Sequence, residues 1–137
     1  MLVKDLMTSD VTTLRRNEKL TLADDVMHLG RIRHLPVLDE DGQEVVGIVS
    51  QRDLFHGALT QALGYGRRAR RKLLDTLLVK DVMATEVVVT TPETPLAEAA
   101  RVLTERKIGC LPVVKDGRLV GILTESDFVA WVARKTD

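Results

Sequence analysis

The sequence lacks the features that mark disulfide-stabilised, secreted and membrane-spanning proteins. Its single cysteine, Cys110, cannot form an intramolecular disulfide and suits a reducing compartment. No stretch approaches about 18 consecutive apolar residues, the length typical of a transmembrane helix. The N-terminus has no long apolar run after a basic stretch, as a signal peptide would have. We therefore expect a soluble, cytoplasmic protein with no membrane span.

Aromatic residues and net charge are also scarce. Two phenylalanines, one tyrosine and one tryptophan are the only aromatic residues, so aliphatic side chains must fill any core. Twenty basic residues balance twenty acidic ones, which gives no general attraction to nucleic acids or anionic membranes. With 45% hydrophobic residues among 137, the chain can bury a core as one compact domain or as two half-size units.

The patterns of catalytic and metal sites are missing as well. The three histidines, His28, His34 and His56, have no metal-ligand spacing, and no Cys-x-x-Cys or His-x-x-x-His pattern occurs. There is no Walker lysine and no Gly-x-Ser-x-Gly. Cys110 lies on an apolar stretch, which favours a packed thiol over a reactive one. The sequence predicts no catalytic residue, no metal and no enzyme.

What the sequence does contain is a duplication. Residues 3–7, Val-Lys-Asp-Leu-Met, return 76 positions later as Val-Lys-Asp-Val-Met. Residues 32–37, Ile-Arg-His-Leu-Pro-Val, return with the same offset as Ile-Gly-Cys-Leu-Pro-Val. Residues 46–53 return at 120–127 with an offset of 74, after a shortened turn. Ordered matches of this density predict two repeats, at 1–60 and 79–137, separated by a basic linker or helix at 61–78.

Each copy predicts the order β-α-β-β-α. A short strand is expected at 11–14 and at 87–90, from its alternation and β-branched residues. The next segments place apolar residues at helical spacing, Leu22 to Leu29 and Leu96 to Leu103. Two β-branched runs around a glycine turn predict a hairpin, and a helix follows from Gln51 and from Glu125. One copy buries too little alone, so we expect an α/β (α+β) fold in which the copies pack as a pseudo-twofold pair.

The most specific local pattern is Gly-Ile-[Val/Leu]-[Ser/Thr]-x-x-Asp, found at 47–53 and at 121–127. A hydroxyl followed three residues later by an acid, where a strand gives way to a helix, is typical of a capping box. The same two groups also converge at a helix start, where free N–H groups and the positive end of the dipole attract phosphate. The carboxylate can accept hydrogen bonds from ribose hydroxyls. Capping and binding are compatible, and both interpretations stay open.

Taken together, these patterns resemble the cystathionine-β-synthase (CBS) repeat. The resemblance rests on Asp-[Leu/Val]-Met, Leu-Pro-Val, the glycine turn and Val-Gly-Ile-x-[Ser/Thr]-x-x-Asp, and it covers residues 3–57 and 79–131. It implies a Bateman module, a regulatory pair with two clefts that bind AMP, ADP, ATP or S-adenosylmethionine and control an attached or partner protein. It also implies a homodimer, because a self-complementary dimer is the usual outcome for such discs.

The resemblance further implies that each cleft combines base-contacting segments of one repeat with the Ser/Thr-x-x-Asp of the other. Carried over position by position, cleft A comprises Thr8, Val11, Thr12, Ile32, Arg33, His34, Pro36, Thr124, Ser126 and Asp127. Cleft B comprises Ala84, Val87, Val88, Ile108, Gly109, Cys110, Pro112, Ser50, Arg52 and Asp53.

The two predicted clefts differ in chemistry. Cleft A has Arg33, whose forked guanidinium suits phosphate, where cleft B has Gly109. It also has the hydroxyl of Thr8 where cleft B has Ala84, although Arg52 supplies a charge to cleft B. We expect cleft A to be the better site for polyphosphates.

Three further hypotheses remain open from the sequence. The module could be purely structural or dimerising, without a ligand. The basic run from Arg67 to Lys72 is typical of a solvated linker, but it also suits ligand phosphates, an acidic partner or a nucleic-acid-binding adaptor. Phe128 and Trp131 on the last helix suit either the core or a dimer interface.

Overall fold

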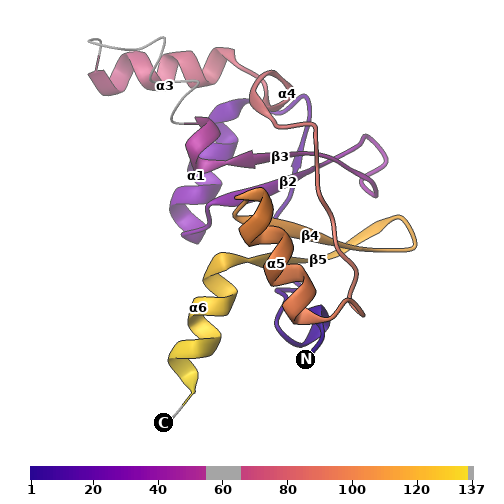
Figure 1. The fold of residues 1–137 in the computed structure, drawn as a ribbon. Helices are drawn as coiled ribbons and strands as arrows, with labels where there is room; N and C mark the ends of the chain where they lie inside the picture. Colours follow the sequence, from indigo (N-terminus) through magenta and orange to yellow (C-terminus); the bar gives the residue numbers. More distant parts are fainter. Residues whose placement is uncertain (55–65, 136–137) are drawn as a thin grey trace. The chain divides into compact units, whose positions relative to one another are not determined.

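The computed structural model describes residues 1–54 and 66–135, and it divides into two compact units (Figure 1). Unit 1 combines Met1–Val11 with Val88–Asp137, and unit 2 is Thr12–Val87. The chain therefore passes from one unit to the other after Val11 and again after Val87. These two points are related by the same offset of 76 that relates the sequence copies. Each unit thus takes its body from one copy and a short leading segment from the other.

Unit 2 is built on a three-stranded sheet in the order β1-β2-β3. β1 (Leu14–Arg15) runs parallel to β2 (His34–Leu38), which pairs antiparallel with β3 (Val45–Ser50). Helix α1 (Leu20–Gly30) connects β1 to β2, and residues 51–54 are helical directly after β3. Helices α3 (Gly66–Thr76) and α4 (Val79–Val82) complete the unit.

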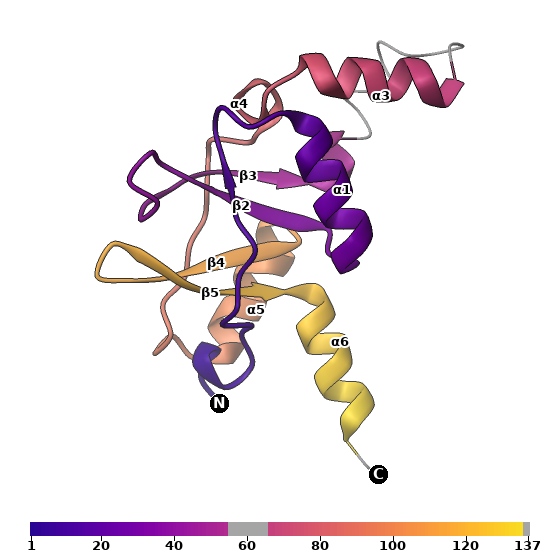
Figure 2. The ribbon, with the colours of Figure 1, turned by 180° about the vertical axis from the view of Figure 1, so that it is seen from behind.

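Unit 1 repeats this arrangement with a smaller sheet. The 3-10 helix η1 (Val3–Asp5) takes the place of α4, and α5 (Leu96–Arg106) takes that of α1. Strands β4 (Cys110–Lys115) and β5 (Arg118–Thr124) form an antiparallel hairpin, and α6 (Glu125–Arg134) follows at once. Figure 2 shows the N-terminal segment beside α5 and this hairpin. The predicted helices, hairpins and α/β class are confirmed.

The first predicted strand of each copy is shorter than expected. In copy one only Leu14 and Arg15 pair with β2, and in copy two Thr90 alone bridges to Val113. Thr90 donates to the Pro112 carbonyl at 2.9 Å and accepts from Val114 at 2.9 Å. Pro92 follows two residues later and has no N–H to extend the ladder. The strands predicted at 11–14 and 87–90 were therefore wrong in length.

Each unit has its own hydrophobic core, and each core contains a valine from the leading segment of the other copy. Val79 is fully buried among the side chains of Leu14, Leu20, Leu35 and other residues of unit 2. Val3, its equivalent 76 positions earlier, is fully buried in the core of unit 1. Burial of a valine contributes roughly 1.5–3 kcal/mol, so the exchanged segments are structural members of the unit they join.

Matching backbone hydrogen bonds hold these segments in place. In unit 1, Val3 donates to the Thr94 carbonyl at 2.9 Å and Leu96 donates to that of Met1 at 2.9 Å. In unit 2, Val79 donates to Glu18 at 2.9 Å and Leu20 to Leu77 at 2.8 Å, and every partner is shifted by 76. The duplication therefore preserved the exchange along with the fold.

The glycine of each Val-Gly-Ile motif makes room for the exchanged segment. A Cβ on Gly121 would lie 2.6 Å from Met7 Sδ and 3.1 Å from the Thr8 carbonyl oxygen. A Cβ on Gly47 would meet Met83 Sδ and the Ala84 carbonyl oxygen at the same distances. Side chains do not tolerate such approaches without movement. In each unit, the methionine of the Asp-[Leu/Val]-Met motif thus packs against the glycine of the Val-Gly-Ile motif, and a side chain at that glycine would clash with it.

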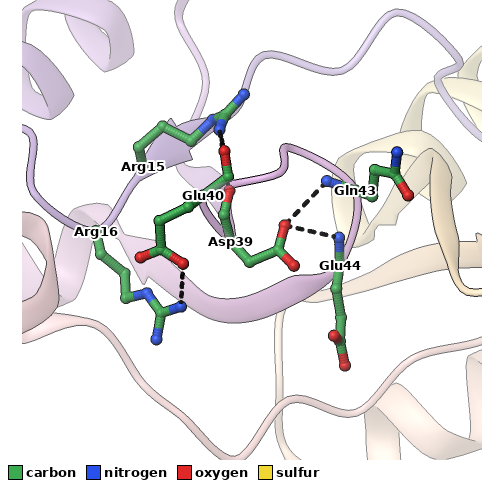
Figure 3. Close-up of polar contacts among 6 residues, drawn as sticks. All are labelled: Arg15, Arg16, Asp39, Glu40, Gln43 and Glu44. Carbon is green, nitrogen blue, oxygen red and sulfur yellow. Dashed lines mark hydrogen bonds and ion pairs between the residues drawn. The ribbon is translucent and has the colours of Figure 1, made fainter.

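The two hairpin turns are built differently. In unit 1 only Asp116 and Gly117 separate the strands, and both have positive φ, 53° and 77°, which is the signature of a type I′ turn. In unit 2 the longer turn at 39–44 is tied by side chains (Figure 3). Arg15 Nη1 donates to the carbonyls of Asp39 at 3.0 Å and Glu40 at 2.9 Å.

The carboxylate of Asp39 closes the same turn. It accepts the backbone N–H groups of Gln43 at 3.1 Å and Glu44 at 3.3 Å (Figure 3). These hydrogen bonds, led by that from Gln43, lower the pKa of Asp39 from its usual 3.8. Arg16 pairs with Glu40 at 2.8 Å on the flank of the turn.

Helix α1 differs from the expected apolar pattern. Ala23 and Met27 are buried as predicted, but Leu22 is 43% exposed and Leu29 is 87% exposed. The buried face of α1 consists of Leu20, Ala23 and Met27. Leu22 and Leu29 lie on the other face of the helix, outside the core.

Candidate ligand-binding site

The Ser/Thr-x-x-Asp motif of copy one forms a reciprocal cap where β3 gives way to helix. The backbone N–H of Ser50 donates to Asp53 Oδ2 at 2.9 Å, and the N–H of Asp53 donates to Ser50 Oγ at 3.1 Å. Both residues are half-buried. The capping interpretation of the motif is confirmed here, because two helix-start donors find side-chain acceptors.

Copy two uses the same residue types with different bonding. The backbone N–H of Thr124 donates to Asp127 Oδ2 at 2.8 Å, but Thr124 Oγ1 donates to the same oxygen at 3.2 Å. Both donors therefore converge on one carboxylate oxygen. The hydroxyl of Thr124 thus supports the carboxylate, whereas that of Ser50 accepts from the backbone.

A second hydroxyl reaches Asp127, from the exchanged segment. Thr8 Oγ1 donates to Asp127 Oδ1 at 3.5 Å, within unit 1. The Thr8 backbone is paired with that of Ile122 on β5, which places its side chain near the start of α6. The corresponding residue of unit 2 is Ala84, paired in the same way with Ile48, and it has no hydroxyl to offer. Thr8, Thr124 and Asp127, three members of the set predicted for cleft A, therefore lie together within unit 1.

The predicted base-contacting strands lie beside the motif of their own copy. His34 is opposite Ser50 in the sheet, and Cys110 is opposite Thr124. The carbonyl of Arg33 accepts from Gln51 at 2.8 Å, and that of Gly109 accepts from Glu125 at 3.1 Å. Within each unit, the structure therefore brings together members of the two different predicted sets.

Each predicted set is divided evenly between the units. Cleft A draws Thr8, Val11, Thr124, Ser126 and Asp127 from unit 1, and Thr12, Ile32, Arg33, His34 and Pro36 from unit 2. Cleft B draws Ala84, Val87, Ser50, Arg52 and Asp53 from unit 2, and Val88, Ile108, Gly109, Cys110 and Pro112 from unit 1. The grouping of the residues into complete clefts stays a prediction.

The cysteine of the second set is a packed thiol. Cys110 is 7% exposed, and burial raises its pKa to about 12. At neutral pH the thiol is protonated, so it is a poor nucleophile. The interpretation as a packed residue is confirmed.

Two structural roles escaped the sequence reasoning. Asp5 Oδ2 accepts the backbone N–H of Leu2 at 2.7 Å, and Asp81 Oδ2 accepts that of Leu78 at 2.9 Å. The aspartate of each leading segment therefore caps a short helix, η1 in unit 1 and α4 in unit 2. An acid three residues after an extended residue was the available signal.

The remaining candidate residues are the histidines, the aromatic residues of the last helix and the basic run. No group of three metal-ligating side chains occurs among the residues that the structure describes, and His56 lies beyond those residues. Phe128 and Trp131 are partly buried against the core of unit 1, in agreement with the core interpretation. The basic run from Arg67 to Lys72 lies within the helix α3. Within the described ranges, no helix is long and apolar enough to cross a membrane.

Comparison with known proteins agrees with this architecture. The family model of the CBS domain matches residues 3–59 and 79–134. A CBS domain-containing protein of Dictyostelium discoideum is 32% identical over 130 residues, which cover 94% of this chain and 89% of that protein. Several other relatives are much longer, and the chain spans 23% to 41% of their length.

Solved structures give the same result. The CBS domain pair of protein MJ0100, in complex with 5′-methylthioadenosine and S-adenosyl-L-methionine, is 26% identical with a TM-score of 0.78, and the match covers 99% of this chain and 98% of that one. CBSX2 in complex with AMP is 29% identical with a TM-score of 0.77, over 97% and 96% of the two chains. With both repeats matched by the family model and the fold shared along its whole length, this chain belongs to the CBS domain family, as a pair of CBS domains.

Proposed function

We propose that this CBS pair is a regulatory module that binds an adenosine-containing ligand, one of AMP, ADP, ATP or S-adenosylmethionine, and acts on a partner protein in trans. The observation that carries the proposal is the convergence of Thr8 and Thr124 on the carboxylate of Asp127. The ligands of MJ0100 and CBSX2, which are all adenosine derivatives, support the choice of ligand class.

The bonding of Asp127 leaves capacity for a ligand. Its Oδ2 is engaged by Thr124, but its Oδ1 has only the 3.5 Å contact with Thr8 among the residues that the structure describes. That contact lies at the limit of a hydrogen bond, so a ribose hydroxyl can replace or join it. The start of α6, with its positive dipole end, suits a nearby phosphate.

The division of the predicted sets supports a regulatory role. Each predicted set has five residues in each unit. A ligand shifts a conformational equilibrium by its differential affinity for the two states. We propose that such a shift is what a partner protein senses.

The same proposal includes no turnover. The motif residues supply hydroxyls and carboxylates but no nucleophile paired with a base, and the thiol of Cys110 is protonated. We further propose that the module works in the cytoplasm and as a homodimer, and the resemblance to CBS discs supports the homodimer.

A second candidate function is a purely structural module. The observation that favours it is the pair of capping interactions at Asp53 and Asp127, which explain both motifs without a ligand. In that case both aspartates stabilise helix starts and nothing else.

A nucleotide panel separates the two candidates. We expect AMP, ADP, ATP or S-adenosylmethionine to raise the melting temperature, because a ligand that binds only the native state stabilises it. Calorimetry should give a Kd in the micromolar range, roughly −7 to −9 kcal/mol. The Asp53→Ala/Asp127→Ala variant should bind none of them. Absence of any shift or heat at millimolar ligand would leave the structural module as the function.

A further inference from the structure

The sulfur-containing side chains lie at very different depths in this protein. The sequence has four methionines and one cysteine. Cys110 and Met27 are 7% and 4% exposed, whereas Met1 is 59% exposed. Met7 and Met83 are half-buried, and each belongs to an exchanged leading segment. These two side chains therefore combine access for a small oxidant with a place in the packing of a unit.

The thioether of Met7 packs directly on a strand. A Cβ on Gly121 would lie 2.6 Å from its Sδ and 3.2 Å from its Cγ, so the sulfur occupies the side-chain position of that glycine. Met7 also packs against the core of unit 1. The backbone donors beside it are engaged, because Met7 donates to the Val3 carbonyl at 2.9 Å and Thr8 donates to that of Ile122 at 2.9 Å. An oxygen atom added to the sulfur would thus meet backbone on one side and apolar atoms on the other.

Oxidation by hydrogen peroxide adds such an oxygen. The thioether sulfur gives up two electrons, the O–O bond of the peroxide breaks, and methionine and hydrogen peroxide become methionine sulfoxide and water. A polar, chiral group then replaces a flexible apolar one. A polar group in an apolar contact is unfavourable unless it finds a hydrogen bond, and solvent supplies that bond if the side chain moves out. The oxidised side chain should therefore leave the glycine.

The next residue along the chain connects this contact to the candidate ligand site. Thr8 exchanges two backbone hydrogen bonds with Ile122, both at 2.9 Å, directly beside Gly121. The hydroxyl of Thr8 donates to Asp127 Oδ1 at 3.5 Å. Movement of the Met7 side chain away from β5 therefore displaces the adjacent peptide and, with it, this hydroxyl.

Unit 2 contains the same contact without the hydroxyl. A Cβ on Gly47 would lie 2.6 Å from Met83 Sδ and 3.0 Å from its Cγ. Ala84 exchanges backbone hydrogen bonds with Ile48 at 2.8 Å and 3.0 Å. The methyl group of Ala84 cannot donate to Asp53 as Thr8 does to its aspartate. Oxidation of Met83 should therefore loosen a segment without removing a hydroxyl from a carboxylate.

We propose that Met7 is an oxidative modification site, at which methionine sulfoxide releases the leading segment of unit 1 from β5 and withdraws Thr8 from Asp127. Met83 undergoes the same chemistry, and its effect is confined to packing. A methionine sulfoxide reductase, with a dithiol as reductant, removes the oxygen as water and restores the contact. The consequence for nucleotide affinity rests on the proposed function, whereas the release of the segment does not.

The first measurement needs no ligand. The full chain is treated with hydrogen peroxide, and each methionine is followed by peptide mass spectrometry. We expect Met7 and Met83 to react before the buried Met27. Amide hydrogen exchange in the oxidised protein should rise by about tenfold or more at Thr8 and Ile122. In Met7→Leu, a change that nearly conserves volume and cannot form a sulfoxide, exchange at these two amides should not respond to peroxide.

The second measurement compares the two units. Met7→Gln and Met83→Gln place a polar side chain of similar length at each position without peroxide. With AMP, ADP, ATP and S-adenosylmethionine as probes, calorimetry should show that Met7→Gln weakens binding about fivefold more than Met83→Gln, because only Met7→Gln disturbs a hydroxyl on a carboxylate. Peroxide-treated Met83→Leu, in which residue 7 is the half-buried methionine that remains, should show the same loss as Met7→Gln. It gives the comparison again should Met7→Gln not fold.

Three results would overturn the proposal. Hydrogen exchange at Thr8 and Ile122 stays unchanged in protein that carries a sulfoxide at residue 7. Met7→Leu and the wild type respond equally to peroxide at these amides. Met7→Gln and Met83→Gln lose equal affinity, which would leave Met7 with no effect beyond packing. If no probe binds the untreated protein, the proposed function fails, while the exchange measurement still decides whether oxidation releases the segment.

Discussion

The two units of this protein share their core packing and helix capping, but they differ at several surface positions and turns. Both bury a valine of the exchanged segment, both place a glycine under a methionine, and both cap a helix start with an aspartate. The shared features are those that packing and backbone hydrogen bonding demand. A residue that recurs at equivalent positions in both units is therefore explained by the fold first.

The differences between the units lie where the fold makes no demand. Thr8 contacts Asp127 in unit 1, while Ala84 stands at the equivalent place in unit 2. Leu22 and Leu29 are exposed on α1, while the exposed Glu98 and Glu105 stand at the equivalent positions of α5. One hairpin turns on two residues with positive φ, and the other is held by Arg15 and Asp39. Functional residues are best sought at these positions. Because the two units differ there and still share a fold, the fold does not require either residue.

The largest expected effect separates the two aspartates. Asp127→Ala should weaken nucleotide binding roughly tenfold to a few hundredfold, since hydrogen bonds to a charged acceptor contribute about 1.5–3 kcal/mol each. Asp53→Ala should weaken it less, because no hydroxyl from residue 84 adds to that site. Calorimetry on both variants measures the difference.

The control for this pair must lose a cap without touching the ligand sets. Asp5→Ala and Asp81→Ala remove the carboxylates that cap η1 and α4, and they should lower the melting temperature but keep the affinity. Equal affinity losses at Asp53 and Asp127 would contradict the asymmetry. Unchanged affinity at both would show that the motif serves capping alone.

The exchange of leading segments predicts the next effect. Val3→Ala and Val79→Ala should each lower the free energy of unfolding by about 2 kcal/mol, since each removes buried methyl groups from a packed core. The two substitutions should loosen different parts of the structure. Hydrogen exchange should rise in α5 and the β4–β5 hairpin for Val3→Ala, and in α1 and the β2–β3 hairpin for Val79→Ala. Loosening of the hairpin in the same sequence copy as the substitution would contradict the exchange.

The sequence predicted the local elements well because local patterns report local structure. Hairpins, capping motifs and the order of elements follow from glycine turns, β-branched runs and helical spacing. The exchange was not predictable, because Val3 and Val79 have the same surroundings in sequence and either hairpin offers the same glycine. The exposure of Leu22 and Leu29 was not predicted. Apolar residues at helical spacing do not by themselves show which of them the core buries. The roles of Met7 and Met83 depend on a contact far along the chain, which no local pattern contains.

A smaller loss of stability should follow from adding a side chain at the glycine that packs against a methionine. Gly121→Ala places a Cβ 2.6 Å from Met7 Sδ and should cost about 1–2 kcal/mol. Met7→Ala removes the atom that the new Cβ meets, so the double variant should be more stable than the sum of the single changes implies. Denaturant unfolding of the four proteins in the cycle measures the coupling, and strictly additive losses would contradict the steric pairing. The same cycle at Gly47 and Met83 should give a matching value.

The smallest effect concerns the turn of unit 2 and its dependence on pH. The pKa of Asp39 is lowered below 3.8, chiefly because its carboxylate accepts the N–H of Gln43. A carboxyl whose pKa is lower in the folded state stabilises that state above its unfolded pKa, and the contribution disappears as pH falls through the lowered value. Amide signals of Gln43 and Glu44, followed by NMR from about pH 6 to about pH 2, should therefore titrate with a midpoint below 3.8. Asp39→Asn keeps the acceptor oxygen but removes the charge, so the titration of these two amides should vanish. The turn of unit 1 depends instead on the backbone of Asp116 and Gly117, and its amides should be unaffected by the substitution. A midpoint above 3.8 in the wild type would show that the carboxylate is not held by the turn, and the contrast between the two hairpins would then rest on Arg15 alone.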